Sequence, residues 1–281
     1  MKFVIPLLTA VAACYCVAIE HIFFSEWNLY KLQFGKNYES RVEEEFRMRV
    51  FLENRHLITK HNTEYELGLH TYKLGVNQFS DRLDHELFGM NAIKINREMV
   101  TDGATFITPE NTVIPDEMDW RTKGAVTRVK NQKMCNSCYA FSATGSLESQ
   151  QFRKTGKLVS LSEQNIIDCS SKFGNHGCDG GLDTLSFDYI KNNGGIDTEE
   201  SYPYESRNNG GIDTEESYPY ESRKAYQCRY KNETIGAKVT GYVKLPEGDE
   251  EKLKEAVATI GPISVGIDSS SKNFFYYKEG E

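Results

Sequence analysis

The most informative stretch of the sequence reads Gln132-Lys133-Met134-Cys135-Asn136-Ser137-Cys138-Tyr139-Ala140-Phe141-Ser142. Ser137 is a good N-cap, so we expect a helix that starts at Cys138 and ends before Gly156. The unpaired N–H groups and the dipole at a helix start favour the thiolate form of a thiol placed there. Gln132 can donate its side-chain amide to an oxyanion, together with the backbone N–H of Cys138. The stretch therefore predicts a cysteine nucleophile beside an oxyanion site.

Further helices are expected downstream of this stretch. Residues 160–163 form a capping box for a second helix, and residues 182–191 predict a third helix that Gly194 ends. Residues 250–260 predict a fourth helix, and residues 263–267 alternate as a strand does. Because the helices come first and the strands last, the fold class is expected to be α+β.

The N-terminus has the pattern of a secretory signal peptide over residues 1–18. Lys2 precedes a mostly apolar run over residues 3–17 that is short for a bilayer span, and Ala18 offers a cleavage site. The alternative interpretation is a membrane anchor. The rest of the 281-residue chain has no sustained apolar run, which excludes a multi-span membrane protein. The formal net charge of the whole sequence is −8 and is spread without a basic patch, which argues against a nucleic-acid partner.

Five cysteines follow the expected signal peptide: Cys135, Cys138, Cys169, Cys178 and Cys228. In an oxidising compartment, an odd number is most simply divided into two disulfides and one free thiol. That thiol is either a spare buried side chain or a retained nucleophile. The first two cysteines have zinc-like spacing, but no second pair follows, so we expect neither a metal nor another cofactor.

The region before residue 113 is expected to be largely helical. Residues 26–36 and 41–65 place apolar and polar side chains at helical spacings. Residues 72–81 look polar and irregular, and residues 91–114 look like an exposed linker. We therefore expect a helical N-terminal unit that is joined by a linker to a second unit.

A tandem duplication interrupts the second unit at 192–223. Residues 192–207 are repeated without change as residues 208–223. Two copies do not make a solenoid. The preferred interpretation is a recent duplication or a sequence-assembly error, and the alternative is a functional insertion.

Several motifs resemble the papain family of cysteine proteases, and its cathepsin L branch in particular. Beyond the stretch at 132–142, they are Asp119-Trp120-Arg121, Leu161-Ser162-Glu163-Gln164-Asn165, Asp168-Cys169-Ser170, Gly177-Cys178-Asp179-Gly180-Gly181, Glu200-Ser201-Tyr202-Pro203-Tyr204 and Gly261-Pro262-Ile263-Ser264-Val265. Six residues fill the long-helix motif of the family's propeptide: Glu43, Arg47, Phe51, Asn54, Ile58 and Asn62. Four more fill its second propeptide motif: Gly75, Asn77, Phe79 and Asp81.

The resemblance implies a papain-like α+β fold of two subdomains, a helical left one and a β-rich right one that is incomplete here. An α-helical inhibitory propeptide precedes it. The expected divisions are a signal peptide at 1–18, a propeptide at 22–81, a linker at 82–112 and a truncated peptidase domain at 113–281.

The resemblance also implies roles for particular residues. Cys135 should pair with Cys178 and Cys169 with Cys228, which leaves Cys138 free. Gly180 and Gly181 would pair with the backbone of an extended substrate, and Leu182 would wall a hydrophobic subsite. Asn232 begins the glycosylation sequon Asn232-Glu233-Thr234.

The sequence departs from the family at two places. Lys133, Met134, Asn136 and Tyr139 replace the usual residues around the thiol. The catalytic histidine and its orienting asparagine are expected no earlier than about residue 284, whereas the sequence ends at Glu281. Five of its six histidines precede the peptidase domain, and the sixth, His176, reads as a surface residue.

The expected function is that of a cathepsin L-like endopeptidase that cleaves protein or peptide substrates through an acyl-enzyme at Cys138. It would be a monomeric zymogen of the lysosome or the extracellular digestive space, inhibited by its own propeptide. This chain is expected to lack the catalytic histidine and asparagine. The alternative is a non-catalytic fragment or pseudoenzyme whose propeptide binds and inhibits related proteases.

Overall fold

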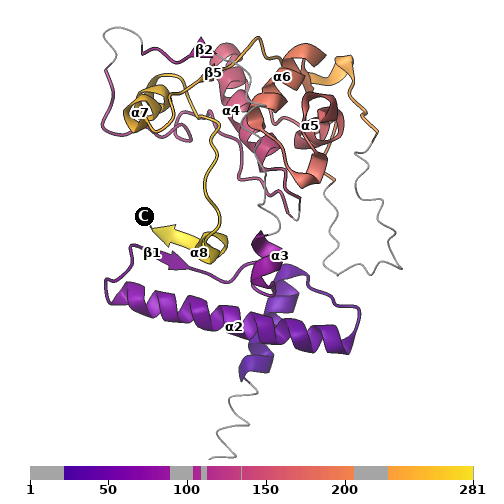
Figure 1. Ribbon diagram of the computed structural model, residues 1–281, viewed down its shortest axis with the longest axis vertical. Coiled ribbons are helices and arrows are strands. Elements are labelled where there is room, and N and C mark those ends of the chain that lie inside the picture. Colours follow the sequence, from indigo (N-terminus) through magenta and orange to yellow (C-terminus); the bar gives the residue numbers. More distant parts are fainter. Residues whose placement is uncertain (1–21, 89–103, 109–112, 134, 206–226, 281) are drawn as a thin grey trace, which may run out of the picture. The chain divides into compact units, whose positions relative to one another are not determined.

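The computed structural model describes residues 22–88, 104–108, 113–133, 135–205 and 227–280. These residues form two compact units (Figure 1). Unit 1 contains residues 22–88 and 268–280, and unit 2 contains the other described residues. Each unit is described by itself. None of the described helices is long and apolar enough to cross a membrane.

Unit 1 is built on one long helix. Its elements are a helix over 22–34, α2 (Arg41–Glu66), β1 (Tyr72–Leu74), α3 (Asp84–Phe88), α8 (Lys272–Tyr276) and β6 (Tyr277–Gly280). Ser40 caps α2, because its side chain accepts a hydrogen bond from the backbone N–H of Glu43. The predicted helices thus form, with the first of them shifted toward the N-terminus.

An aromatic cluster joins the two N-terminal helices of unit 1. Trp27, Tyr30 and Phe51 are buried together, and the ring centroids of Tyr30 and Phe51 lie 4.5 Å apart. On α2 the buried side chains recur every three or four residues, as the sequence predicted for one helix face: Arg47, Val50, Phe51, Asn54, Ile58 and His61.

A short antiparallel ribbon joins distant segments within unit 1. β1 pairs with β6, with Tyr72 opposite Gly280 and Lys73 opposite Glu279. The prediction that residues 72–81 are wholly irregular is therefore wrong for the strand. The partner strand comes from the far end of the sequence, so no local pattern could reveal it.

Three of the four described helices of unit 2 pack around one hydrophobic core. Its helices are α4 (Cys138–Thr155), α5 (Glu163–Cys169), α6 (Asp183–Asn193) and α7 (Glu250–Thr259), with short 3-10 turns η3 (Ser171–Phe173), η4 (Gly177–Asp179) and η5 (Asn232–Thr234). Its strands are β2 (Ala104–Thr105), β3 (Ile196–Asp197), β4 (Ile235–Ala237) and β5 (Val243–Lys244). β3 and β4 are antiparallel, and β2 and β5 are parallel. Side chains of α4, α5 and α6 share a hydrophobic core that includes Ala140, Ile166 and Ile190.

Three local predictions for unit 2 need correction. Ser137 takes the N-cap position of α4 but makes no side-chain cap, because its hydroxyl contacts the carbonyl of Cys135 and the hydroxyl of Tyr204. α5 begins two residues later than a box at Ser160 would place it, and Ser162 is its cap. Residues 263–267 form no strand, and short strands instead lie between the helices. The predicted ends are correct at Gly156 and Gly194, which both adopt left-handed backbone conformations.

The first copy of the repeat belongs to unit 2 as far as residue 205. It supplies the end of α6, strand β3 and the buried side chain of Tyr202. The second copy at 208–223 lies outside the described residues. So do the expected signal peptide at 1–18 and most of the expected linker at 82–112.

Candidate active site

Cys138 is the first residue of α4 and is the free cysteine among the described residues. The other four described cysteines form the disulfides Cys135–Cys178 and Cys169–Cys228, which are the pairings that the resemblance implies. The first disulfide ties the loop before α4 to η4. It therefore holds the segment that leads into the free thiol.

The electrostatic surroundings of Cys138 differ from the prediction. Part of the residue faces solvent, but burial of the sulfur is the largest influence and raises the pKa of the thiol. The N–H groups of Tyr139 and of Cys138 itself lower the pKa, as expected at a helix start. The charge of Asp183 raises it further. The helix start alone therefore does not make a thiolate here, and no histidine of the described residues is hydrogen-bonded to this thiol.

Gln132 lies in the loop before α4, where its groups are used to hold that loop. Its side-chain amide donates to the carbonyl of Cys135 at 2.9 Å. Its own carbonyl accepts from the hydroxyl of Tyr204 at 2.7 Å, and that hydroxyl lies 3.0 Å from the Ser137 hydroxyl. The ring of Tyr204 also packs edge-on against Phe141, with centroids 5.0 Å apart. The first copy of the repeat thus supports the loop that carries Gln132.

Lys133 gives this loop a backbone conformation that side chains disfavour. Its φ of 54° makes it the one non-glycine residue with positive φ in the described parts of the chain. Such a conformation costs about 1–2 kcal/mol for an ordinary L-residue. Its N–H donates to the side chain of Asn131 at 2.8 Å, which helps to hold the turn. The replacement at Lys133 therefore strains the loop, whereas Met134 is outside the described residues.

Gly180, Gly181 and Leu182 follow η4 and lead into α6. The buried side chain of Asn175 accepts a hydrogen bond from the N–H of Leu182 at 2.9 Å. A Cβ on Gly181 would lie 2.3 Å from the Asn175 carbonyl oxygen, so only glycine fits there. His176 is exposed, as predicted, and its N–H donates to the carbonyl of Gly180 at 2.8 Å. Packing alone therefore explains the need for Gly181.

A buried charge cluster links α4, which carries Cys138, to α5. The ammonium of Lys130 lies 2.6 Å from carboxylate oxygens of both Glu148 on α4 and Glu163 on α5. Both carboxylates are 1% exposed. Burial raises the pKa of Glu163, although Lys130 opposes this effect. The two carboxylates in turn outweigh burial at Lys130 and raise the pKa of that ammonium.

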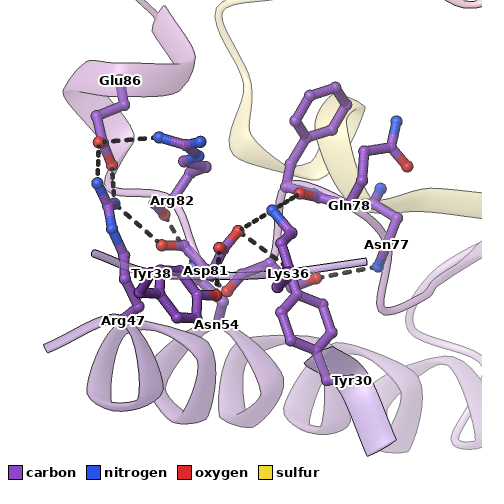
Figure 2. A network of polar contacts seen from close by, with 12 residues as sticks. Tyr30, Lys36, Tyr38, Arg47, Asn54, Asn77, Gln78, Asp81, Arg82 and Glu86 are labelled. Carbon is purple, nitrogen blue, oxygen red and sulfur yellow. Dashed lines mark hydrogen bonds and ion pairs between the residues drawn. The ribbon is translucent and has the colours of Figure 1, made fainter. Parts of the chain in front are cut away.

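Unit 1 contains a second polar network, centred on Asp81 (Figure 2). One carboxylate oxygen of Asp81 accepts from the Tyr30 hydroxyl at 2.9 Å and from the Lys36 ammonium at 2.8 Å. The other accepts from the Tyr38 hydroxyl at 2.8 Å. Burial lowers the pKa of Lys36, although Asp81 opposes this effect. Asp81 thus fastens the second propeptide motif to the N-terminal helix region.

Arg47 extends the network from α2 to α3. Its guanidinium bonds both carboxylate oxygens of Glu86, at 2.8 and 2.9 Å, and the carbonyl of Asp81 at 3.2 Å (Figure 2). Burial raises the pKa of Glu86, but Arg47, the N–H of Leu83 and the charge of Arg82 outweigh it, so the net shift is downward. Glu86 is thus held as a carboxylate in unit 1.

The remaining propeptide-motif residues hold the segment after α2. Asn54 donates to the carbonyls of Ser80 and Arg82 at 3.0 Å, and Asn62 exchanges two hydrogen bonds with the backbone of Leu74. The other contacts of the motif are an ion pair of Glu43 with Arg47 at 3.7 Å, burial of Ile58, a hydrogen bond from the N–H of Gly75 to Tyr276, one from Asn77 to Phe275, and an edge-on contact of Phe79 with Phe275. Most of these residues therefore hold the segment that follows α2, whereas Phe51 packs in the aromatic cluster of unit 1.

Comparisons with known proteins match the chain to two family models, one for each part of a protease precursor. A family model described as papain family cysteine protease matches residues 114–210 and 206–281, and one described as cathepsin propeptide inhibitor domain matches residues 27–87. The chain belongs to the papain family of cysteine proteases. It is a cathepsin L-like peptidase of the zymogen type, and its propeptide domain lies in unit 1. The break in the peptidase match falls inside the repeat.

Relatives of this papain-family chain include insect cathepsins. It is 47% identical over 289 residues to a cathepsin L-like peptidase of Aedes aegypti. This match covers 100% of this chain and 80% of the relative. It is 49% identical over 283 residues to cathepsin L of Sarcophaga peregrina, which covers 98% and 78%. A solved structure of digestive procathepsin L 3 of Tenebrio molitor larval midgut matches with a TM-score of 0.79 and 35% identity, over 92% of this chain and 77% of that one.

Several residues of the two sites were given no role from the sequence, although Ser142 and Ser264 lie in motifs quoted above. In unit 1 they are Tyr30, Lys36, Tyr38 and Glu86, and near the thiol they are Ser142, Asp183 and Ser264. The sequence offered only charged and polar residues at helical spacings. A single sequence does not show whether such residues are buried or lie on a solvated face. Asn232 lies exposed at η5.

Proposed function

We propose that this chain is a cysteine endopeptidase, made as a secreted or lysosomal zymogen, whose nucleophile is Cys138. The observation that carries the proposal is a free thiol at the start of α4, while the other four described cysteines are disulfide-bonded. The thiolate attacks the carbonyl carbon of a protein or peptide substrate. A thioester forms, the amine leaves with a proton, and water then hydrolyses the thioester and restores the thiol.

Gln132 and the glycine segment would serve substrate and transition state. The amide of Gln132 would join the N–H of Cys138 at the oxyanion, for which it must exchange its present hydrogen bond to Cys135. The backbones of Gly180 and Gly181 would pair with an extended peptide, and Leu182 would contact an apolar side chain beside it.

Proton transfer limits the rate of peptide hydrolysis that we expect for this chain. A leaving amine needs a proton, and a positioned acid or base is typically worth about 10²–10⁴ in rate. The described residues bring no imidazole to Cys138, and its pKa is raised. We therefore expect the 281-residue chain to react slowly with peptidyl electrophiles and to turn over peptide substrates hardly at all.

The test compares labelling and turnover in the full chain. A peptidyl vinyl sulfone should label Cys138 alone, as mapped by mass spectrometry, and Cys138→Ala should abolish the label. Labelling at a disulfide cysteine would show that the pairing fails in solution. Substrate turnover that survives Cys138→Ala would exclude this residue as the nucleophile.

A second function, inhibition of related proteases by the propeptide, is favoured by one contact. β1 belongs to the segment that matches the propeptide inhibitor domain, whereas its partner β6 lies within the segment that matches the peptidase family. A related peptidase could therefore offer the equivalent strand to β1. Residues 22–112 should inhibit a relative such as cathepsin L of Sarcophaga peregrina, less strongly at acidic pH than at neutral pH.

Asn77→Ala provides the variant for this test, because Asn77 donates to the carbonyl of Phe275 just before β6. The variant should weaken inhibition, whereas Thr59→Ala, on the exposed face of α2, should leave it unchanged. Equal inhibition by both variants would show that the β1 contact is not used on a separate protease.

A further inference from the structure

A chain of polar side chains ends near the thiol of Cys138. The Ser142 hydroxyl lies 2.7 Å from the Ser264 hydroxyl, which donates to a carboxylate oxygen of Asp183 at 2.6 Å. Ser142 lies four residues after Cys138 on α4, so both side chains project from the same face of that helix. The carboxylate of Asp183 is thereby fixed on the face of α4 that carries the thiol.

Asp183 also adjoins the segment expected to bind substrate. It is the first residue of α6 and follows Gly180, Gly181 and Leu182 directly. Its second carboxylate oxygen accepts from the N–H of Thr184 at 2.8 Å. Both donors are neutral, and among the described residues no Lys or Arg forms an ion pair with Asp183. The side chain is half-buried, so solvent and ligands reach it.

The effect of this charge on the thiol is unfavourable for the chemistry. The charge of Asp183 raises the pKa of Cys138, which already lies in a site where burial raises it. A negative charge without a cationic partner also attracts cations to the same place. A bound cationic group would satisfy the carboxylate and relieve its effect on the thiol together.

We infer that Asp183 selects substrates in which the side chain beside Leu182 is long and ends in a cation, as in Lys or Arg. Leu182 contacts the aliphatic stem, and Asp183 pairs with the charged end. This inference rests on the proposed function and refines its expectation of an apolar side chain at that place. Asp183 acts here as a specificity residue and takes no part in bond making.

The first test measures the charge field at Cys138 with small reagents that need no peptidase activity. The full chain is treated with three methanethiosulfonates that carry a cationic, a neutral or an anionic group. Each transfers its alkylthio group to the Cys138 sulfur as a disulfide and releases methanesulfinate. The fraction of thiolate affects all three rates equally, so the ratio of the cationic to the anionic rate reports the local charge alone.

Asp183→Asn should lower that ratio about threefold or more, since it removes one charge near the sulfur and keeps an acceptor for Ser264. Asp249→Asn is the matched control, because Asp249 is likewise an acid at a helix start, on α7, and Asn also caps helices. It should leave the ratio unchanged. The same ratio measured in urea gives the value for an unfolded chain, so loss of folding in a variant is recognised directly.

The second test uses N-acetylated dipeptidyl vinyl sulfones that differ only in having Arg or Leu next to the reactive residue. The full chain should be labelled at Cys138 faster by the Arg compound, and Asp183→Asn should reverse this preference. If both compounds label Cys138 but Asp183→Asn leaves their ratio unchanged, the inference is wrong and the proposed function stands. If neither labels it while the small reagents show the charge effect, the proposed function fails. An unchanged small-reagent ratio in Asp183→Asn overturns the inference by itself.

Discussion

Units 1 and 2 bury charged side chains in opposite ways. In unit 1 the half-buried carboxylate of Glu86 pairs with Arg47, and the buried carboxylate of Asp81 pairs with Lys36. In unit 2 the carboxylates outnumber the cations, because Glu148 and Glu163 share the single ammonium of Lys130. Unit 1 therefore pairs these acids with cations, whereas unit 2 holds more carboxylates than cations in its interior.

This difference gives the two units opposite responses to acid. The pKa of Glu86 is lowered, so its contribution to stability is present above the pKa of the unfolded chain and is lost as the pH falls. The pKa of Glu163 and that of Asp168 are raised, mainly by burial. Their contribution is complete below the unfolded pKa and is lost as the pH rises through the folded pKa. Acidification therefore weakens unit 1 relative to unit 2.

The largest effect is expected from Lys130→Met. It leaves two buried carboxylates without a cation, which should lower the free energy of unfolding of unit 2 by about 3–5 kcal/mol. Urea denaturation followed by tryptophan fluorescence and circular dichroism measures it. Lys238→Met, at an exposed position, is the control and should change stability by less than about 0.5 kcal/mol. If Lys130→Met also changed the free energy of unfolding by less than about 0.5 kcal/mol, the two carboxylates would not need Lys130 as their cation.

Arg47→Met should produce the second largest effect, and in unit 1. It removes the guanidinium donor from both oxygens of Glu86 and from the carbonyl of Asp81, which we expect to destabilise unit 1 by about 2–4 kcal/mol. Arg41→Met removes an ion pair from the exposed start of the same helix and should have almost no effect. Hydrogen exchange of α2 in the full chain distinguishes loss of unit 1 from loss of unit 2.

The pH dependence should be a smaller effect, because protonation of Glu86 removes its charge but not all of its hydrogen bonds. Between neutral pH and pH 4, hydrogen-exchange protection in unit 1 should fall while that in unit 2 is kept or rises. Glu86→Gln should flatten the dependence of unit 1. The same slope in both units would contradict the opposite pKa directions.

The hydrogen bond between Tyr202 and Asp168 allows a test of which copy of the repeat packs into unit 2. The hydroxyl of Tyr202 donates to Asp168 at 2.6 Å, and burial together with this carboxylate raises the pKa of Tyr202 to about 12. Tyr202→Phe should therefore cost about 1–2 kcal/mol. Tyr218 occupies the same place in the second copy, and Tyr218→Phe should cost nothing. Equal losses in the two variants would mean that both copies compete for one site.

The smallest predicted effect concerns the loop before the thiol. Lys133→Gly removes the strain of a positive φ, partly offset by the greater entropy of glycine in the unfolded chain, and should stabilise unit 2 by about 0.5–1 kcal/mol. Lys123→Gly, in a turn without that conformation, should give no gain. A loss of stability in Lys133→Gly would show that contacts of the Lys133 side chain offset the strain of its positive φ.

The sequence predicted what depends on neighbours along the chain. The long helix α2 and its buried face were correct because the spacing of Arg47, Phe51, Asn54 and Ile58 is a local signal. The disulfide partners were available only from the resemblance, since spacing leaves the pairing open. The helix start at Cys138 with Ser137 in the N-cap position was correct, but the expected side-chain cap is absent because the Ser137 hydroxyl contacts the carbonyl of Cys135 and the hydroxyl of Tyr204.

Features that depend on distant segments could not be predicted. β1 has a partner about 200 residues away, and the partner residues carry no mark of that pairing in their own sequence. The sequence predicted no role for Asp183. Its place by Cys138 became evident only through Ser264, which is 81 residues further along.

The pairing of β1 with β6 also has a consequence for how the protein is made. Residues 72–74 leave the ribosome about 200 residues before residues 277–280, which at 5–20 residues per second is roughly 10–40 s. During that time the helices over 22–34 and α2 can form, but one edge of β1 has no partner from its own chain. An unpaired edge is open to pairing with another nascent chain. Completion of unit 1 must therefore wait until residues 277–280 have been synthesised.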